Sequence, residues 1–282
     1  MSPQNRLRIT DRSTGRGARA STGGQLRAGC RQRVKAVSSC GKTVPSPSDL
    51  SSLRGMAGAQ VEQIRRGKVR VPLDKAIAWV AEYTSPERVN SRNPYSYPAY
   101  DEFERDHNEP SLLTDADLLS PGLLNVPVKV RSYYGLLRVR PRLEQALANQ
   151  GLEVPLEEIE SPARIAEMVK PLYAVLDEPG EKPWGVEGTT LSKVLHRKRP
   201  QSVVLHDRWV RTCYVGKDAP IPKAKSRSWA DYMVAVTLAI RDDLCAQPDH
   251  FKVLDEATSC PGRLSAVRLL DIVAWKSKGD SA

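Results

Sequence analysis

The chain has 282 residues, of which 43 are Lys or Arg and 33 are Asp or Glu, giving a formal net charge of +10. Its longest apolar stretch, residues 233–240, is eight residues long and includes a Thr, whereas a membrane-spanning helix needs about 20 apolar residues. The five cysteines are scattered and form no Cys-x-x-Cys pair, so they indicate neither a zinc site nor a disulfide framework. We therefore expect one or two soluble domains in a reducing compartment such as the cytoplasm, with no membrane partner and no cofactor.

The positive charge is concentrated in residues 1–50, which hold ten basic and two acidic side chains; the rest of the chain, with 33 basic and 31 acidic, carries only +2. The segment has no Phe, Trp or Tyr, so it cannot bury enough apolar area to offset the entropy of ordering. We predict a disordered basic arm. Three explanations stay open: a nucleic-acid-binding arm, an organelle transit segment, or an upstream stretch outside a native product that starts at Met56.

Residues 51–282 predict an all-α domain, because apolar residues recur at intervals of three and four and strand signals are nearly absent. Helix start signals are frequent along this stretch. Pro72 opens one helix, and Ser85 and Ser161 each stand as N-cap residues before a proline. Thr114 begins a capping-box sequence, Thr-x-x-Asp.

Residues 90–110 have a different character, with four aromatic side chains among Asn, Pro and Asp. Tyr100 and Phe103, which flank Asp101, could form an aromatic binding edge. We favour the other interpretation, in which this stretch is a loop pinned to the core by its rings.

The C-terminal third predicts the clearest helices. Ser228 caps a long amphipathic helix, and residues 264–275 are apolar almost all round, as expected of a central helix. On that last helix Arg268 and Asp271 are three residues apart, which favours a structural ion pair. We expect one compact multi-helix domain; two lobes that meet near residues 179–183 are an alternative.

The most unusual run begins with a Gly-x-x-Gly turn and continues as a short basic helix that ends at Pro200. Backbone N–H groups at a helix start favour phosphate, and nearby cations add to the positive field. After a short apolar stretch, Asp207 enters the next helix. The candidate nucleic-acid-binding residues are Gly185, Gly188, Lys193, His196, Arg197, Lys198 and Arg199.

This run resembles a known bacterial family. The strings Lys193-Val-Leu-His-Arg-Lys-Arg-Pro200 and Asp207-x-x-Val210, together with the closing string of residues 268–275, are similar to a family catalogued only as a domain of unknown function. The resemblance covers roughly residues 68–276 and implies no activity.

A more distant resemblance links Gly185-Val-x-Gly188, the following Lys193 and the later Asp207 to the helix-hairpin-helix DNA glycosylases. In that superfamily the hairpin amides grip a DNA phosphate, a lysine attacks the sugar C1′ in bifunctional members, and an aspartate supports loss of the base. The resemblance therefore implies that Gly185 and Gly188 are hairpin glycines and that Lys193 and Asp207 are catalytic residues.

Each of these residues also has a structural interpretation. Lys193 and Arg197 could form a solvated helix face, and Asp207 could be an N-cap or an ion-pair partner of a nearby arginine. His196 and His206 are expected to orient neighbours or lie on the surface, because the few His residues and the absence of a close carboxylate pattern make a metal site a poor fit.

Two functions follow. The leading hypothesis is a helical domain that binds DNA or RNA. Its most specific version adds an enzymatic activity like that of a DNA glycosylase or lyase. The alternative is a non-enzymatic helical module in which the basic string, residues 193–199, contacts an acidic protein partner.

Overall fold

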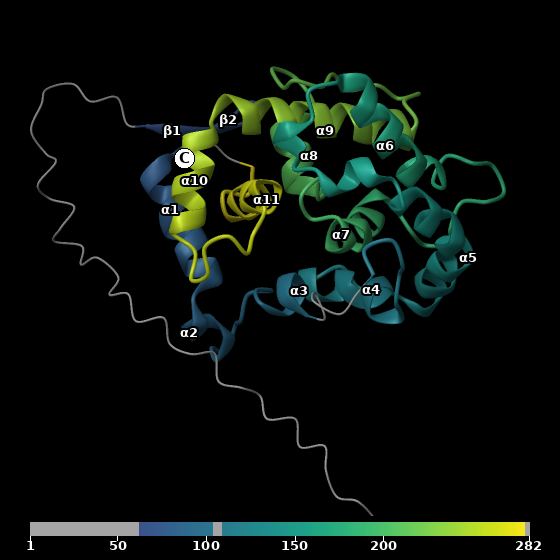
Figure 1. Ribbon diagram of the computed structural model, residues 1–282, viewed down its shortest axis with the longest axis horizontal. Coiled ribbons are helices and arrows are strands. Elements are labelled where there is room, and N and C mark those ends of the chain that lie inside the picture. Colours follow the sequence, from purple (N-terminus) through teal and green to yellow (C-terminus); the bar gives the residue numbers. More distant parts are fainter. Residues whose placement is uncertain (1–61, 104–108, 280–282) are drawn as a thin grey trace, which may run out of the picture. The chain divides into compact units, whose positions relative to one another are not determined.

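The computed structural model of the protein describes residues 62–103 and 109–279 (Figure 1). Predictions about the basic arm and about Met56 lie outside these residues. Within them the structure has eleven α-helices and a single two-stranded sheet, which confirms the all-α prediction. No helix in this described part is long and apolar enough to cross a bilayer.

The small sheet was not predicted. β1 (Gln63–Arg66) and β2 (Val69–Pro72) pair antiparallel, with Ile64 opposite Val71. Gly67 makes the turn with a φ of +56°, a left-handed conformation that favours glycine. Four-residue strands give too short an alternation of apolar and polar residues to be recognised by periodicity, which explains the omission.

The helices before the basic run follow the predicted start signals. They are α1 (Leu73–Thr84), α2 (Pro86–Val89), α3 (Ala99–Glu102), α4 (Asp115–Leu119), the 3₁₀ helix η3 (Ser120–Leu124), α5 (Val130–Leu147), η4 (Gln150–Glu153), η5 (Leu156–Glu158) and α6 (Pro162–Ala174). The hydroxyls of Ser85, Thr114 and Ser161 each accept a hydrogen bond from a backbone N–H two or three residues later. These three predicted caps are confirmed.

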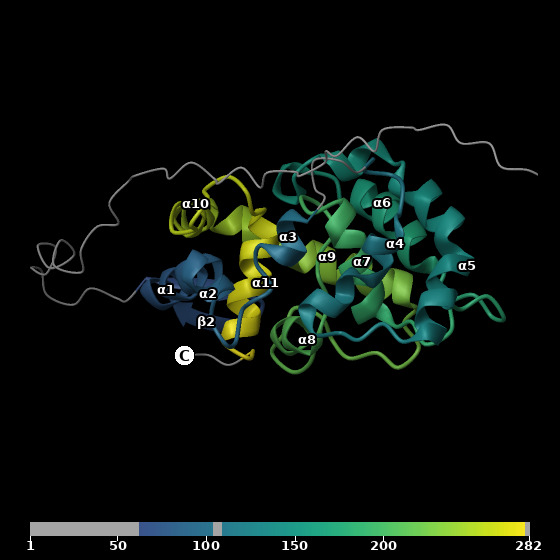
Figure 2. The same ribbon diagram turned by 90° about the horizontal axis from the view of Figure 1, so that it is seen from below.

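The later helices are α7 (Gly188–Lys198), α8 (Arg208–Tyr214), α9 (Trp229–Ala246), α10 (Pro248–Glu256) and α11 (Ala266–Lys276). Ser228 caps α9, as predicted. The closing helix α11 lies between α1 and α10 on one side and α8 and α9 on the other (Figures 1 and 2). Every residue from Val267 to Ala274 is buried, so its prediction as the central helix is confirmed.

The aromatic segment before α4 is pinned to the core and contains the short helix α3. Tyr97 and Tyr100 are buried, and the Tyr100 hydroxyl donates a hydrogen bond of 2.6 Å to the backbone carbonyl of Lys193. Phe103 is half exposed, and residues 104–108 are not described. The predicted pinning by the rings is therefore confirmed for the described part of the segment, and the loop prediction holds there except for residues 99–102, which form α3.

Residues Gly58–Ala282 form one compact unit, with a hydrophobic core that runs from Ile64 to Ala274. The alternative of two lobes near residues 179–183 stays a prediction. One tight contact in the core fixes the start of the basic helix: Gly188 lies under the ring of Trp229, where a Cβ atom would overlap the ring.

We expect Gly188→Ala to lower the free energy of unfolding by about 1–3 kcal/mol, because the added methyl group must displace Trp229. Urea denaturation measures the change. Gly122→Ala is the matched control, since a Cβ at Gly122 meets nothing within 4 Å. Equal stability of the two variants would contradict this packing.

Candidate functional site

A cleft of about 620 Å³ opens between α7, the start of α8, α11 and two loops. Its size lies in the range of pockets that hold small ligands. Charged side chains line it: Lys193 from α7, Asp207 and Arg208 at the start of α8, and Arg268 and Asp271 from α11. Lys193 and Asp207, paired by the distant resemblance, thus face one cavity.

Lys193 is buried, with 4% of its surface exposed. Its ammonium forms no hydrogen bond or ion pair with any residue of the described segments. Burial lowers the pKa of Lys193, and the nearby charge of Arg268 lowers it further, while the carboxylates of Asp271 and Asp207 oppose the shift. A buried amine with few partners and a lowered pKa is closer to the neutral, nucleophilic form than an ordinary lysine.

Asp207 caps the helix α8 and also lines the cleft. Its Oδ1 accepts hydrogen bonds from the N–H groups of Trp209 and Val210, at 2.8 Å and 3.0 Å, so the N-cap interpretation holds. Within the described residues its Oδ2 has no hydrogen-bond partner, and the side chain lines the cleft. The cap therefore fixes the carboxylate while leaving one oxygen for a ligand.

A buried guanidinium supports the floor of the cleft. Arg268 donates to Asp101 at 2.7 Å, to Asp271 at 2.5 Å and to the Tyr83 hydroxyl at 2.8 Å. The predicted pair of Arg268 and Asp271 is confirmed, and Asp101 extends it. Burial raises the pKa of Asp271, while Arg268 and Lys193 oppose the shift.

One wall of the cleft is aromatic. Tyr83 and Tyr95 stack with ring centroids 5.3 Å apart, and Trp275 packs edge-on against both, at 5.9 Å and 5.6 Å. All three rings line the cavity. These rings and Asp271 were not among the predicted site residues, because Trp275 is far from both tyrosines in the sequence. The available signal for Asp271 was an acidic residue on a helix that is apolar almost all round.

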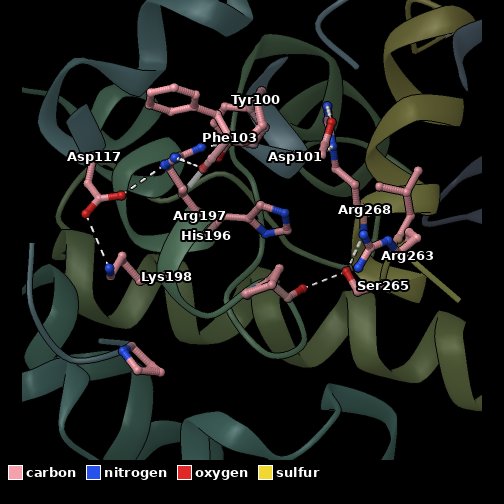
Figure 3. Close-up of a pocket in the computed structure, with 13 residues that line it drawn as sticks. Tyr100, Asp101, Phe103, Asp117, His196, Arg197, Lys198, Arg263, Ser265 and Arg268 are labelled. Atoms are coloured by element: carbon pink, nitrogen blue, oxygen red, sulfur yellow. Dashed lines mark hydrogen bonds and ion pairs between the residues drawn. The ribbon is translucent and has the colours of Figure 1, made fainter. Parts of the chain in front are cut away.

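The basic string lies inside the protein. Asp117 sits between Arg197 and Lys198, at 2.9 Å and 3.3 Å (Figure 3), and Arg199 contacts Glu153 at 3.1 Å and donates to the Leu147 carbonyl at 2.7 Å. Only 3–6% of each cationic side chain is exposed. Arg197 also donates to the carbonyls of Tyr100 and Phe103. These cations contact the buried Asp117 carboxylate, backbone carbonyls and, in the case of Arg199, the exposed Glu153. Lys193 is buried as well, so the solvated-face interpretation of Lys193 and Arg197 is wrong.

His196 and Gly185, the remaining predicted binding residues around this helix, also have local partners. His196 is buried, with Nδ1 2.7 Å from the Val203 carbonyl and its ring stacked on Tyr100. Gly185 is exposed and has a φ of +67°, and its carbonyl accepts a hydrogen bond from Ser132. The string thus anchors α7 in the fold, and Lys193 is the cation on it that lines the large cleft.

Comparison with known proteins assigns the family. Residues 76–278 match the model of a family described as "Family of unknown function (DUF6308)". The chain belongs to this family. The first resemblance from the sequence is thereby confirmed. No curated protein and no solved structure matches the DUF6308 chain significantly, so the comparisons lend no support to the glycosylase resemblance.

Loss of one carboxylate beside Arg268 should be costly. We expect Asp101→Asn to lower the free energy of unfolding by about 3–5 kcal/mol, because it leaves a buried guanidinium partly uncompensated. Glu187→Gln is the control: the side chains of Glu187 and its partner Lys182 are 61% and 45% exposed, and such pairs contribute less than about 1 kcal/mol. A cost for Asp101→Asn no larger than that of the control would refute the buried network.

His206 makes folding sensitive to acid. Burial lowers the pKa of His206 to about 4, against 6.5 for an ordinary histidine. Between these pH values the imidazole binds a proton in the unfolded chain but not in the folded chain. Protonation therefore favours the unfolded chain, and the free energy of unfolding decreases as the pH falls from 6.5 towards 4. We expect this loss to reach about 1–3 kcal/mol.

Urea denaturation from pH 7 to pH 4.5, in the parent protein and in His206→Gln, measures this effect. Glutamine stays neutral and can still bond the Tyr232 hydroxyl, which lies 2.9 Å from His206 Nε2. The variant should therefore lose less stability on acidification. Parallel stability curves for the two proteins would show that His206 is not the group responsible.

Proposed function

We propose that this protein binds DNA or RNA, that the cleft takes up one nucleotide of the strand, and that Lys193 and Asp207 act on the sugar of that nucleotide as a DNA glycosylase or lyase does. The observation that carries the proposal is the placement of Lys193: a buried amine without a hydrogen-bonding partner among the described residues, facing the same cavity as the Asp207 carboxylate.

The shape of the cleft supports a nucleotide as ligand. Enzymes that act on a base or its sugar take the nucleotide out of the stack and hold it between aromatic or apolar side chains. The stacked rings of Tyr83 and Tyr95 offer such a surface, and about 620 Å³ accommodates a base with its sugar. Exposed Arg208, at the edge of the cleft, can pair with the phosphate.

The chemistry uses the lysine as nucleophile. The neutral amine of Lys193 attacks C1′, and the bond from C1′ to the base breaks with its electron pair going to the base nitrogen, which takes a proton from water. The new ammonium gives one proton to Asp207, which passes it to O4′ as the sugar ring opens, and the hydroxide left by that water takes its second proton. A Schiff base between Lys193 and C1′ results.

The other residues of the basic string act by positioning in this proposal. The ion pairs of Arg197 and Lys198 with Asp117 hold α7 in register, and the packing of Gly188 under Trp229 fixes its first turn. Arg199 and His196 anchor the end of the same helix. Lys193 is thereby presented to the cleft at a fixed depth.

Borohydride trapping tests the reacting pair. An oligonucleotide with an abasic site presents C1′ as an aldehyde, which condenses with an amine, loses water and is reduced to a stable covalent adduct. We expect the parent protein to form this adduct and Lys193→Met to form none. Asp207→Asn keeps the α8 cap and should slow trapping by about 100-fold.

Lys182→Met is the matched control, because Lys182 is half exposed, pairs with Glu187 and does not line the cleft. Mass spectrometry of the adduct should locate the modification at Lys193. Equal trapping by the parent protein and Lys193→Met, or an adduct spread over surface lysines, would refute the proposed chemistry.

A second candidate function is a protein-interaction module, favoured by an apolar patch on α5. Val130 and Tyr134 are 73% and 58% exposed and lie one turn apart on the helix, and Trp184, 50% exposed, packs under Arg138 of the same face. Loss of nucleic-acid binding in Lys193→Met but not in Tyr134→Asp supports the cleft; absence of nucleic-acid binding by the parent protein favours the protein-interaction module.

A further inference from the structure

A second cavity lies on the other side of the segment that precedes and begins α8. It has a volume of about 480 Å³. Adjacent residues divide between the two cavities: Asp207 lines the large cleft, whereas His206 lines the second cavity. We call this second cavity the α9 groove, because Trp229 and Tyr232 from the first turn of α9 form its base.

The rim of the α9 groove is positively charged. Arg211, Lys223, Lys225 and Arg227 all line it, and no carboxylate does. None of these four side chains forms a hydrogen bond or ion pair with another residue of segments 62–103 and 109–279. They differ in this respect from Arg197, Lys198 and Arg199, each of which contacts a carboxylate or a carbonyl.

The carboxylates beside the first turn of α9 are already engaged. Asp177 accepts hydrogen bonds from the N–H groups of Trp229 and Ala230, at 2.6 Å and 2.9 Å. Asp231 pairs with Lys170 at 2.8 Å and bonds the Ser228 hydroxyl. Asp231 also attracts Arg227 electrostatically, so the charge of Arg227 is partly offset. The rim still presents the positive charges of Arg211, Lys223 and Lys225, with no carboxylate on it, which favours an anionic ligand.

The base of the groove is aromatic and held in place. The rings of Trp229 and Tyr232 meet edge to face at 5.6 Å, and both contact His206, at 5.8 Å and 5.3 Å. Both are only partly buried, so they offer ring surface to the groove. Cations around partly exposed aromatic rings are the combination that binds single-stranded nucleic acid, with phosphates on the cations and bases on the rings.

We infer that the α9 groove binds the nucleotides next to the one held in the cleft, with backbone phosphates on Arg211, Lys223, Lys225 and Arg227 and a base against Trp229 and Tyr232. This inference rests on the proposed function and adds the path of the strand. Exposed Arg208 and Arg211, one at each cavity, mark where the strand crosses α8.

The salt dependence of binding tests the groove. The probe is fluorescent single-stranded oligothymidylate or oligouridylate, bound to the full chain and measured by fluorescence anisotropy. Each phosphate contact to a single strand contributes about 0.7 to the slope of log Kd against log salt concentration. We expect Lys223→Gln, Lys225→Gln and Arg227→Gln together to lower the slope by about 2 and to weaken binding at least ~10-fold at low salt.

The control removes the same number of charges elsewhere. Lys68, Arg164 and Lys252 are exposed and line neither cavity. The triple variant Lys68→Gln, Arg164→Gln and Lys252→Gln should keep the slope within about 0.5 of the parent value. Equal slopes for the parent protein and the groove variant, or equal losses in both triple variants, would overturn the inference.

A further variant separates stacking from charge and from folding. Tyr232→Leu keeps an apolar side chain on α9 and should weaken binding while leaving the salt slope unchanged. If borohydride trapping at Lys193 fails but the groove variant still has a lower salt slope, the strand path is supported and the proposed chemistry is refuted. If trapping succeeds and the groove variant binds with the parent slope, only the inference about the groove is refuted. If the parent protein binds neither oligomer at low salt, both proposals are refuted.

Discussion

The guanidinium of Arg268 is the interaction on which the site depends. It joins three segments distant in the sequence, because its partners are Tyr83 on α1, Asp101 on α3 and Asp271 on α11 itself. A buried cation of this kind is tolerated only when its charge and its hydrogen bonds are compensated together. The short helix α3, which carries Asp101, and the helix α1 are thus tied to the central helix at the floor of the cleft.

This arrangement also sets the electrostatics around Lys193. Burial and the charge of Arg268 disfavour the ammonium form, while Asp271, held by Arg268, and Asp207, held by the first turn of α8, favour it. Burial lowers the pKa of Lys193 despite both carboxylates. The fold thus holds an amine beside two carboxylates without the direct ion pair that would engage its nitrogen, an arrangement suited to a nucleophile.

Charge is divided in a consistent way across the described residues. Arg197, Lys198, Arg199 and Arg268 have interior partners and stabilise the packing of α7 and α11. The cations at the α9 groove have no such partners and face solvent. Cations that hold the fold together are therefore distinct from those available to a ligand, and the density of charge along the sequence does not distinguish them.

Much of the fold could be predicted because its signals are local. Ser85, Thr114, Ser161 and Ser228 each form the predicted cap, and the apolar surface of α11 indicated a central helix. The hairpin of β1 and β2 was too short to be recognised. Ion pairs between residues distant in the sequence could not be predicted either. Nothing in the sequence near Arg197 indicates that its carboxylate partner, Asp117, lies 80 residues earlier.

The same limit applies to the candidate site. Family resemblance paired Lys193 with Asp207, and the structure brings both to one cleft. The aromatic wall and Asp271 complete that cleft through tertiary packing, which no spacing along the chain encodes. The four cations of the α9 groove likewise come from two separate stretches of the sequence. They can be recognised as candidate binding residues only from the structure, in which their side chains form no hydrogen bond or ion pair with the described residues.

The proposed chemistry depends on Lys193 being a buried amine with a lowered pKa. NMR titration of the protein with isotope-labelled lysine side chains, compared with Lys193→Met to assign the resonance, measures that pKa directly. The account predicts one lysine signal, absent from the variant, that titrates below the ordinary value of 10.5. A Lys193 signal that titrates at or above that value would contradict it, because the amine would then be as protonated as any surface lysine.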